Sequence, residues 1–459
     1  MLFSSLEFIF LFLPITLIVY YISPSRIKNA VLFVSGIVFY AFGEIRLLPI
    51  FLLTIAVDFI FGLIIGKCRQ KTKIARILLV LAVIFNLSLL GYFKYFDFLR
   101  KSIFGLSPLG ILLPVGISFY TFQALSYVID VYRCEVNPTK NIINFGAYIA
   151  LFPQLIAGPI VKYSDIERQL CERDISSYLA AKGLRTFICG LAKKVILANS
   201  AGELFGFFLK SESYLGALLT VFFFGMQIYF DFSGYSDMAI GLGRMLGFEF
   251  VENFNYPYTS RSVSEFWRRW HISLSSFFKE YVYIPLGGSR KGKMRLVFNL
   301  LTVWTLTGIW HGAAWSFLLW GAYFGLLLII EKLILSKFFD RAPKFLLHVY
   351  SLIFIFLGWL IFASDGITLT AEQGSSVLSR LFFVGLPSFA AAHELFVFAG
   401  AIPFIAILII GSTPLPRRIY LFISKRSSAS SALLPIGALV LSVSYIVSSG
   451  YNPFLYFRF

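Results

Sequence analysis

The chain has 459 residues, of which 58% are hydrophobic and 18% aromatic, and only 14% are charged. Soluble domains carry roughly 25% charged residues, and the deficit here extends along the whole chain, which excludes a soluble protein and a soluble protein with a single anchor. The net charge of +17 matches the Lys and Arg excess that cytoplasmic loops of membrane proteins carry next to anionic lipid. Because no soluble basic domain is present, we expect no nucleic-acid partner.

Apolar runs long enough to span a membrane recur from residues 6–21 to residues 433–447. No basic residue precedes the first run and no small-residue cleavage site follows it, so we predict a retained span rather than a signal peptide. We predict one all-α integral membrane domain over residues 1–459, with about ten to thirteen transmembrane helices, given the length that each span requires.

Basic loops indicate the orientation of the spans. The strongest is KCRQKTKIAR at residues 67–76, which we assign to the cytoplasmic side. Counting spans backwards from it places the N-terminus outside, and counting forwards from the later basic loops places residues 450–459 outside. The later loops assigned to the cytoplasmic side are residues 289–295, 332–344 and 417–426.

The four cysteines, Cys68, Cys134, Cys171 and Cys189, lack the close spacing of metal ligands. Cys68 and Cys134 lie beside loops assigned to the cytoplasm, where disulfides are rare. We therefore expect neither a disulfide framework nor a metal site.

Residues 225–250 are apolar overall but contain Asp231, Asp237 and Arg244. An acid at membrane depth costs a few kcal/mol and usually faces a cavity or a partner. Two interpretations remain open: an Asp–Arg pair that fixes helix packing, or acids that line a reaction channel.

Residues 262–281 are predicted to form a helix. Ser262 and Glu265 have the spacing of a capping box, and apolar residues recur every three or four positions from Phe266 to Tyr281. Basic residues and His271 interrupt the other face, which is typical of an interfacial helix.

Residues 296–331 have a basic stretch at each end, and both stretches are assigned to the cytoplasmic side. The segment must therefore enter the membrane and return as a hairpin. Each arm of about 15 residues reaches roughly 22 Å as a helix, against a hydrocarbon core of about 30 Å. His311 lies near the turn, and a buried histidine is either a structural group bonded to a carbonyl or a proton acceptor.

Six stretches in order resemble the membrane-bound O-acyltransferase family, in its branch that O-acetylates bacterial polysaccharides such as alginate. The stretches are FSSLEFIFLFLPI (3–15), LFPQLIAGPIVKY (151–163), YFDFSGYSDMAIG (229–241), FWRRWHISLS (266–275), YIPLGGSRKG (283–292) and GIWHGAAW (308–315). The resemblance is densest at residues 110–330 and implies a helical bundle around a central channel, with a hairpin and interfacial helices, in the cytoplasmic membrane of a bacterium.

The resemblance further implies acyl transfer from cytosolic acetyl-CoA to a hydroxyl on the far side. The essential buried histidine of the family corresponds to His311, which we expect to act as the base, and the second histidine corresponds to His271, which we expect to orient or polarise the thioester carbonyl. We expect the CoA phosphates to be bound by Arg268, Arg269, Arg290, Lys291 and Lys293. The usual excess of basic residues on the cytoplasmic side of a membrane protein also explains these residues. The expected channel-lining residues are Asp231, Asp237, Trp267 and Trp310.

The chain ends in YNPFLYFRF at residues 451–459, after predicted spans over residues 346–448. This tail is either an aromatic belt at the outer interface or, by resemblance, a C-terminal motif in which Tyr456 carries the acyl group. A phenol can serve as a covalent carrier if a base activates it. The expected partner is an extracellular SGNH-hydrolase-like transferase, which passes the acetyl group to a polysaccharide.

Two alternatives remain open. One is a D-alanyl-type transferase of the same family, whose donor is a carrier protein. The other is a transporter of lipid-linked sugars, which explains many spans and buried acids but not a hairpin with a histidine near its turn.

Overall fold

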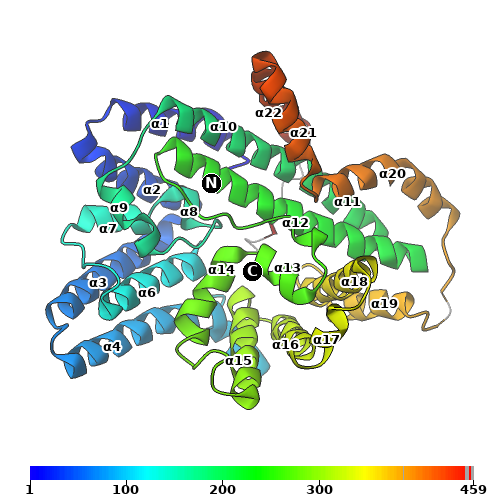
Figure 1. Ribbon diagram of the computed structural model, residues 1–459, viewed down its shortest axis with the longest axis horizontal. Helices are drawn as coiled ribbons and strands as arrows, with labels where there is room; N and C mark the ends of the chain where they lie inside the picture. Colours follow the sequence, from blue (N-terminus) through cyan, green and yellow to red (C-terminus); the bar gives the residue numbers. More distant parts are fainter. Residues whose placement is uncertain (386, 450–453, 456–459) are drawn as a thin grey trace. The chain divides into compact units, whose positions relative to one another are not determined.

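The computed structural model describes residues 1–385, 387–449 and 454–455, and every regular element in these residues is helical (Figure 1). The all-α prediction is therefore confirmed. The chain divides into two compact units. Unit 1 comprises Met1–Ile188 and Tyr235–Glu252, and unit 2 comprises Cys189–Gly234 and Asn253–Phe459. Two helices continue from one unit into the other, α10 (Ser177–Ala192) and α12 (Tyr214–Met245).

Unit 1 contains the N-terminal helices of the chain. Its elements are η1 (Phe8–Phe12), α1 (Leu13–Ile22), η2 (Ser25–Ile27), α2 (Lys28–Glu44), η3 (Ile45–Leu47), α3 (Leu48–Lys67), α4 (Thr72–Leu90), η4 (Gly91–Tyr95), α5 (Phe96–Ser102), α6 (Ile117–Arg133), α7 (Ile142–Ile149), α8 (Phe152–Leu155) and α9 (Tyr163–Cys171), with most of α10 and the end of α12.

Helix α6 is the centre of unit 1, since it is buried along most of its length and packs against both α3 and α4. Gly62 of α3 permits this packing, because a Cβ at that position would collide with the ring of Tyr127 on α6. Asn86 of α4 donates a hydrogen bond to the buried carboxyl of Asp58 on α3, at 2.7 Å. This bond partly satisfies two buried polar side chains where α3 and α4 meet.

Unit 2 contains the later helices. Its elements are η5 (Lys193–Ala198), α11 (Asn199–Phe208), the first part of α12, η6 (Pro257–Thr259), α13 (Val263–Arg269), α14 (Ile272–Phe278), η7 (Lys279–Tyr283), α15 (Lys293–His311), α16 (Trp315–Ile330), η8 (Glu331–Leu335), α17 (Ser336–Phe339), α18 (Lys344–Ala363), α19 (Ala371–Leu381), α20 (Ala392–Gly411), α21 (Leu415–Arg426) and α22 (Ser428–Ser448).

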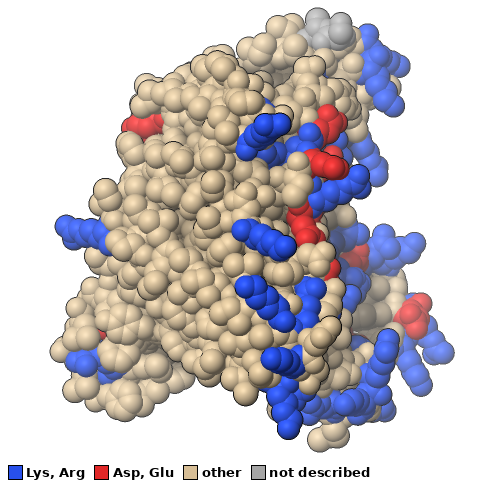
Figure 2. Space-filling model, turned by 90° about the vertical axis from the view of Figure 1, so that its left-hand side faces the viewer, with Lys and Arg blue, Asp and Glu red and all other residues tan. Residues whose placement is uncertain are grey.

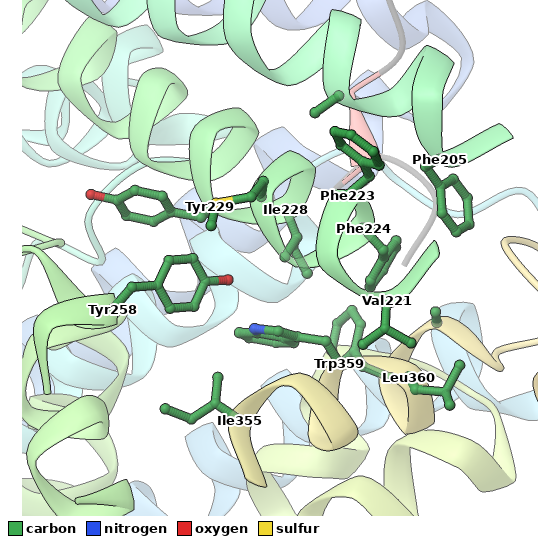
Figure 3. Close-up of a cluster of buried hydrophobic side chains, with 14 of the residues drawn as sticks. Phe205, Val221, Phe223, Phe224, Ile228, Tyr229, Tyr258, Ile355, Trp359 and Leu360 are labelled. Carbon is green, nitrogen blue, oxygen red and sulfur yellow. The ribbon is translucent and has the colours of Figure 1, made fainter. Parts of the chain in front are cut away.

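A large cluster of buried hydrophobic side chains forms the core of unit 2 (Figure 3). Helices α12 and α18 contribute to it from opposite sides, with Phe224 and Ile228 facing Trp359. Tyr258 reaches into the same cluster, and its hydroxyl donates a hydrogen bond to the carbonyl of Gly225 on α12. The segment that leads into α13 is thereby fixed against α12.

Among the described residues, seven helical segments are long and apolar enough to cross a membrane. They are Ser25–Lys67, Thr72–Ser102, Tyr214–Met245, Trp315–Phe339, Lys344–Ala363, Ala392–Gly411 and Ser431–Ser448. Large aliphatic side chains remain exposed on these segments, for example Val34, Ile60 and Ile407. Figure 2 shows a face on which uncharged side chains form a broad expanse, while Lys and Arg gather towards one edge. This surface suits a multi-pass membrane protein.

Candidate active site

The predicted hairpin is present in unit 2 as α15 and α16, which pack against each other along their length. Two glycines bring the helices close together, because a Cβ on Gly308 would collide with the carbonyl oxygen of Phe317, and one on Gly321 with that of Trp304. His311 is the last residue of α15 and directly precedes the turn. Close packing therefore fixes the position of the histidine within unit 2.

Aromatic rings surround the imidazole of His311, which is only 5% exposed. The rings of Trp310 and Trp320 have their centroids 5.0 Å from it, and that of Phe362 on α18 lies at 5.2 Å. All three meet the imidazole nearly edge to face, a favourable geometry for aromatic rings. A neutral imidazole in this position could accept a proton.

His271 lies at a break between α13 and α14, with a left-handed backbone at φ 44° and ψ 54°. The prediction of one continuous helix across residues 262–281 is therefore wrong, although Ser262 does cap its start by accepting a hydrogen bond from Glu265 N at 2.9 Å. The apolar stripe keeps a helical period through the break, so the periodicity gave no sign of it. A left-handed backbone is costly for a residue with a side chain and persists only where surrounding contacts hold it.

The imidazole of His271 is 1% exposed and contacts rings from two helices. Phe232 on α12 lies at 4.8 Å and Trp310 on α15 at 5.9 Å, both edge to face. Trp310 also contacts His311, so the imidazoles of both histidines contact the same indole ring. The structure brings together three of the predicted residues, His271, His311 and Trp310. Burial lowers the pKa of His271 to about 3, so its imidazole is neutral near pH 7.

Trp267, also predicted to line the channel, is buried in the same aromatic cluster. Its ring lies 4.7 Å from Trp304, 4.9 Å from Phe324 and 5.4 Å from Trp320, which in turn contacts His311. These contacts link α13 to the hairpin. Trp267 therefore supports the wall around His311.

Glu331 was not identified from the sequence. It is 3% exposed and continues the second arm of the hairpin. Its carboxylate accepts hydrogen bonds from Val263 N at 2.6 Å and from Ser264 N at 2.8 Å, the first backbone amides of α13. A carboxylate at a helix N-terminus accepts hydrogen bonds from amides that have no partner within the helix, and its negative charge interacts favourably with the helix dipole. Glu331 thus joins the hairpin that carries His311 to the helix that precedes His271.

Asp231 forms an ion pair with Lys194 of η5, with the two charged atoms 3.0 Å apart and both side chains at most 2% exposed. The Asp–Arg pair considered from the sequence is therefore wrong for Asp231, and Arg244 instead donates to Thr186 Oγ1 at 3.0 Å. The second carboxylate oxygen of Asp231 accepts a hydrogen bond from the backbone N–H of Leu455, at 2.9 Å.

The remaining predicted residues occupy three settings. Asp237 is half-buried on the part of α12 that belongs to unit 1, whereas the two histidines belong to unit 2. Phe454 and Leu455 of the tail are buried in unit 2, which excludes an exposed aromatic belt for these two residues. Tyr456 lies outside the described residues.

The basic residues expected at CoA phosphates differ in their settings. Arg269 is half-buried and forms an ion pair with Glu265 at 2.8 Å, and it also donates to the carbonyl of Asn255. Arg268 is exposed. Three further basic residues are exposed in or next to the loop that precedes α15: Arg290, Lys291 and Lys293. The structure therefore leaves four of the five accessible to an anion.

No group of three His, Cys, Asp or Glu side chains suited to a metal ion occurs in the part of the chain that the structure describes. Several aromatic rings contact the two histidines.

These features define a multi-pass helical membrane protein with a buried two-histidine site. Residues 135–371 match the membrane-bound O-acyltransferase family, and the chain belongs to that family. It is therefore an acyltransferase. The probable alginate O-acetylase AlgI of Azotobacter vinelandii is 42% identical over 83% of this chain and 78% of its own length. That of Pseudomonas putida is 37% identical over both full lengths. The peptidoglycan O-acetyltransferase of Helicobacter pylori is 35% identical over 86% of this chain and 81% of its own length.

Proposed function

We propose that this acyltransferase takes an acetyl group from cytosolic acetyl-CoA and moves it across the membrane for O-acetylation of an extracellular polysaccharide. The observation that carries the proposal is the burial of His311 at the turn of the hairpin, where the ring of Trp310 contacts both His311 and His271. The similar proteins named above, which are called alginate and peptidoglycan O-acetylases, support acetyl as the group and a polysaccharide as the acceptor.

In the proposed reaction His311 is the base. Its neutral imidazole takes the proton of the acceptor hydroxyl as the oxygen attacks the thioester carbonyl. A carbon–oxygen bond forms, the carbon–sulfur bond breaks, and the thiolate of CoA leaves and receives the proton. The products are the acetyl ester and CoA, and no metal or redox partner is required.

The donor site of this proposal lies on the cytoplasmic side, beside the exposed basic residues before α15. Arg290, Lys291 and Lys293 would bind the phosphates of CoA, as basic side chains bind phosphate elsewhere. Arg268 would contribute from the end of α13. Asp231, Trp267 and Trp310 of unit 2 would line the path between the donor and the acceptor.

The first acceptor in this proposal is the phenol of Tyr456. Leu455, which directly precedes it in the chain, is 3% exposed and held by Asp231. The burial of Leu455 in unit 2 supports a role for the adjoining Tyr456 within the enzyme. His311 would deprotonate Tyr456, and the acetyl-tyrosine would pass the group onward outside the cell.

The proposed protein partner is an extracellular SGNH-hydrolase-like transferase, which would complete the transfer to the polymer. The proposal places the enzyme in the bacterial cytoplasmic membrane, with both termini outside. Membrane lipid and the polysaccharide complete the set of proposed partners.

The test of the main proposal uses the purified protein in proteoliposomes with radiolabelled acetyl-CoA. His311→Ala is expected to abolish acetyl transfer, while His393→Ala, at an exposed histidine on α20, retains it. In cells, loss of polymer acetylation with normal polymer export supports the transferase. Loss of export would instead favour a transporter, and labelling only from a charged carrier protein would favour the D-alanyl-type reaction.

The tyrosine relay is tested separately. Mass spectrometry of the C-terminal peptide after incubation with acetyl-CoA is expected to find an acetyl group on Tyr456, and Tyr456→Phe should lose polymer acetylation. An unmodified peptide together with full acetylation by Tyr456→Phe would contradict the relay and leave the transferase proposal intact.

A further inference from the structure

Asn253 and His271 form a buried pair, each 1% exposed, in the segment that leads from α12 to α13 and in the break before α14. The backbone carbonyl of Asn253 accepts a hydrogen bond from Ile272 N at 3.0 Å. Its side chain adds further bonds to the start of α14. Asn253, which lies before α13 in the chain, therefore fixes the start of α14, and these bonds explain how His271 keeps its left-handed backbone.

The side-chain oxygen of Asn253 accepts from the backbone N–H of Ser273 at 3.2 Å and from the Ser273 hydroxyl at 2.9 Å. A backbone amide can only donate, so the Asn253 atom at this position is the oxygen and not the amide nitrogen. The same oxygen lies 3.1 Å from Nδ1 of His271. An oxygen that only accepts requires a donor, so Nδ1 of His271 carries the proton.

A neutral imidazole has one protonated nitrogen and one lone pair. Since Nδ1 holds the proton, the lone pair lies on Nε2. That nitrogen is buried and forms no hydrogen bond with any residue in the described part of the chain. The described residues that make ring contacts or hydrogen bonds with the imidazole are Phe232 from α12, Trp310 from α15 and Asn253, and none of these titrates. His271 thus presents a hydrogen-bond acceptor to the site.

This arrangement conflicts with the expectation that His271 polarises a thioester carbonyl. A carbonyl oxygen needs a donor, and a lone pair would repel it. The thioester itself offers only acceptors, whereas the pantetheine arm behind it carries amide N–H groups. A buried acceptor is satisfied by such an N–H and is costly without one.

We propose that Asn253 is a positioning residue that fixes the Nδ1-protonated tautomer of His271, so that Nε2 accepts a hydrogen bond from an amide N–H of the pantetheine arm of the acyl donor. The inference rests on the proposed acyl-thioester donor. It assigns His271 to donor binding, and it leaves removal of the hydroxyl proton to His311.

The tautomer is tested without any substrate. The protein is labelled with 15N-histidine, and the chemical shifts of the two ring nitrogens report which one carries the proton. His271→Ala identifies the signal among the four histidines. A protonated Nδ1 and an unprotonated Nε2 are expected, and the opposite pattern overturns the proposal. Because the measurement involves no acetyl-CoA, it stands apart from the outcome of the transfer assays.

The binding role is tested by steady-state kinetics with acetyl-CoA. Asn253→Ala is expected to raise KM about three- to tenfold, as the loss of one hydrogen bond implies, with a smaller change in kcat. On a His271→Ala background the same substitution should have no further effect on KM, because Asn253 acts through His271. A fall in kcat with unchanged KM would assign Nε2 to the acceptor hydroxyl and overturn the assignment to pantetheine.

Two further variants separate positioning from folding. Ser273→Ala removes a hydrogen bond to the same Asn253 oxygen and leaves His271 in place. KM should then change by no more than about twofold, which is the smallest effect expected from the loss of a hydrogen bond to the donor. Asn253→Asp keeps the accepting oxygens but stabilises the imidazolium, which raises the pKa of His271. KM should then rise on acidification at a higher pH than in the unaltered protein. Asn253 would have only a structural role if the pH profile of Asn253→Asp were unchanged and KM rose equally in Asn253→Ala and Ser273→Ala.

Discussion

Lys194 and Asp231 form an ion pair in the interior of unit 2, and Asp231 at the same time binds the backbone N–H of Leu455. The pair joins η5, α12 and the C-terminal segment. Lys194 also donates to Asn199 Oδ1 at 2.8 Å, so the network reaches α11. A charge pair at this depth is costly to desolvate and strongly unfavourable to break from one side.

Replacing one partner should therefore destabilise the protein. Asp231→Asn retains an oxygen acceptor but leaves the Lys194 charge buried without its carboxylate, and a loss of about 3–5 kcal/mol is expected. Thermal unfolding of the purified protein in detergent measures the effect. The double variant Asp231→Asn/Lys194→Met removes both charges and should recover part of the loss. Equal stability of the single variant and the unaltered protein would show that the pair is not formed.

Leu455→Pro tests what Asp231 does for the tail, because it removes the backbone N–H that Asp231 binds and keeps Tyr456 in the chain. If Asp231 serves the reaction by holding Leu455, Asp231→Ala should lower acetyl transfer in the unaltered protein and have no additional effect in the Leu455→Pro variant. The measurement is acetyl transfer to the polymer at matched protein levels. Additive losses of acetyl transfer in the combined variant would show that Asp231 acts independently of Leu455.

Glu331→Gln is expected to destabilise the link between the hairpin and α13. The substitution removes the charge that faces the amides of Val263 and Ser264, and bonds to a charged group contribute about 1.5–3 kcal/mol each. Glu172→Gln is the matched control, since Glu172 is 79% exposed and forms an ion pair with the exposed Arg168, where a change within about 1 kcal/mol is expected. Equal unfolding temperatures for the two variants would contradict this role.

The length and composition of the apolar segments were sufficient to predict an all-α membrane protein and the hairpin whose first arm ends at His311. Those features depend on local hydropathy and on charges that flank a span. Neither the break at His271 nor the Lys194–Asp231 pair could be predicted. The break depends on bonds from Asn253, 18 positions away, within a segment that keeps a helical period. The pair required a choice of partner for Asp231, and Arg244, on the same helix, was an equally reasonable choice from the sequence.

Gly308→Ala should separate the two arms of the hairpin. The new methyl would meet the carbonyl oxygen of Phe317, which belongs to a helix and cannot move aside on its own. A loss of about 1–3 kcal/mol, typical of overpacking, is expected, and acetyl transfer should fall because His311 lies one turn further along α15. Gly400→Ala on α20 is the control, since no atom lies within 4 Å of its Cβ position. Equal activity and stability of both variants would contradict close packing at Gly308.

Arg268 and Arg269 are neighbours on α13 with different surroundings, which gives a matched pair for the donor site. Arg269 is held by Glu265 and the carbonyl of Asn255. Arg269→Ala should therefore lower the stability of the protein, and any change in KM for acetyl-CoA should follow from that loss of stability. Arg268 is exposed, and Arg268→Ala should raise KM for acetyl-CoA about two- to fivefold, as expected for one exposed charge contact of up to about 1 kcal/mol. Because exposed charges are screened by salt, this difference should shrink as ionic strength rises. A KM that responds to Arg269→Ala alone, at unchanged stability, would place the phosphate contact on Arg269 and require its ion pair with Glu265 to open when the donor binds.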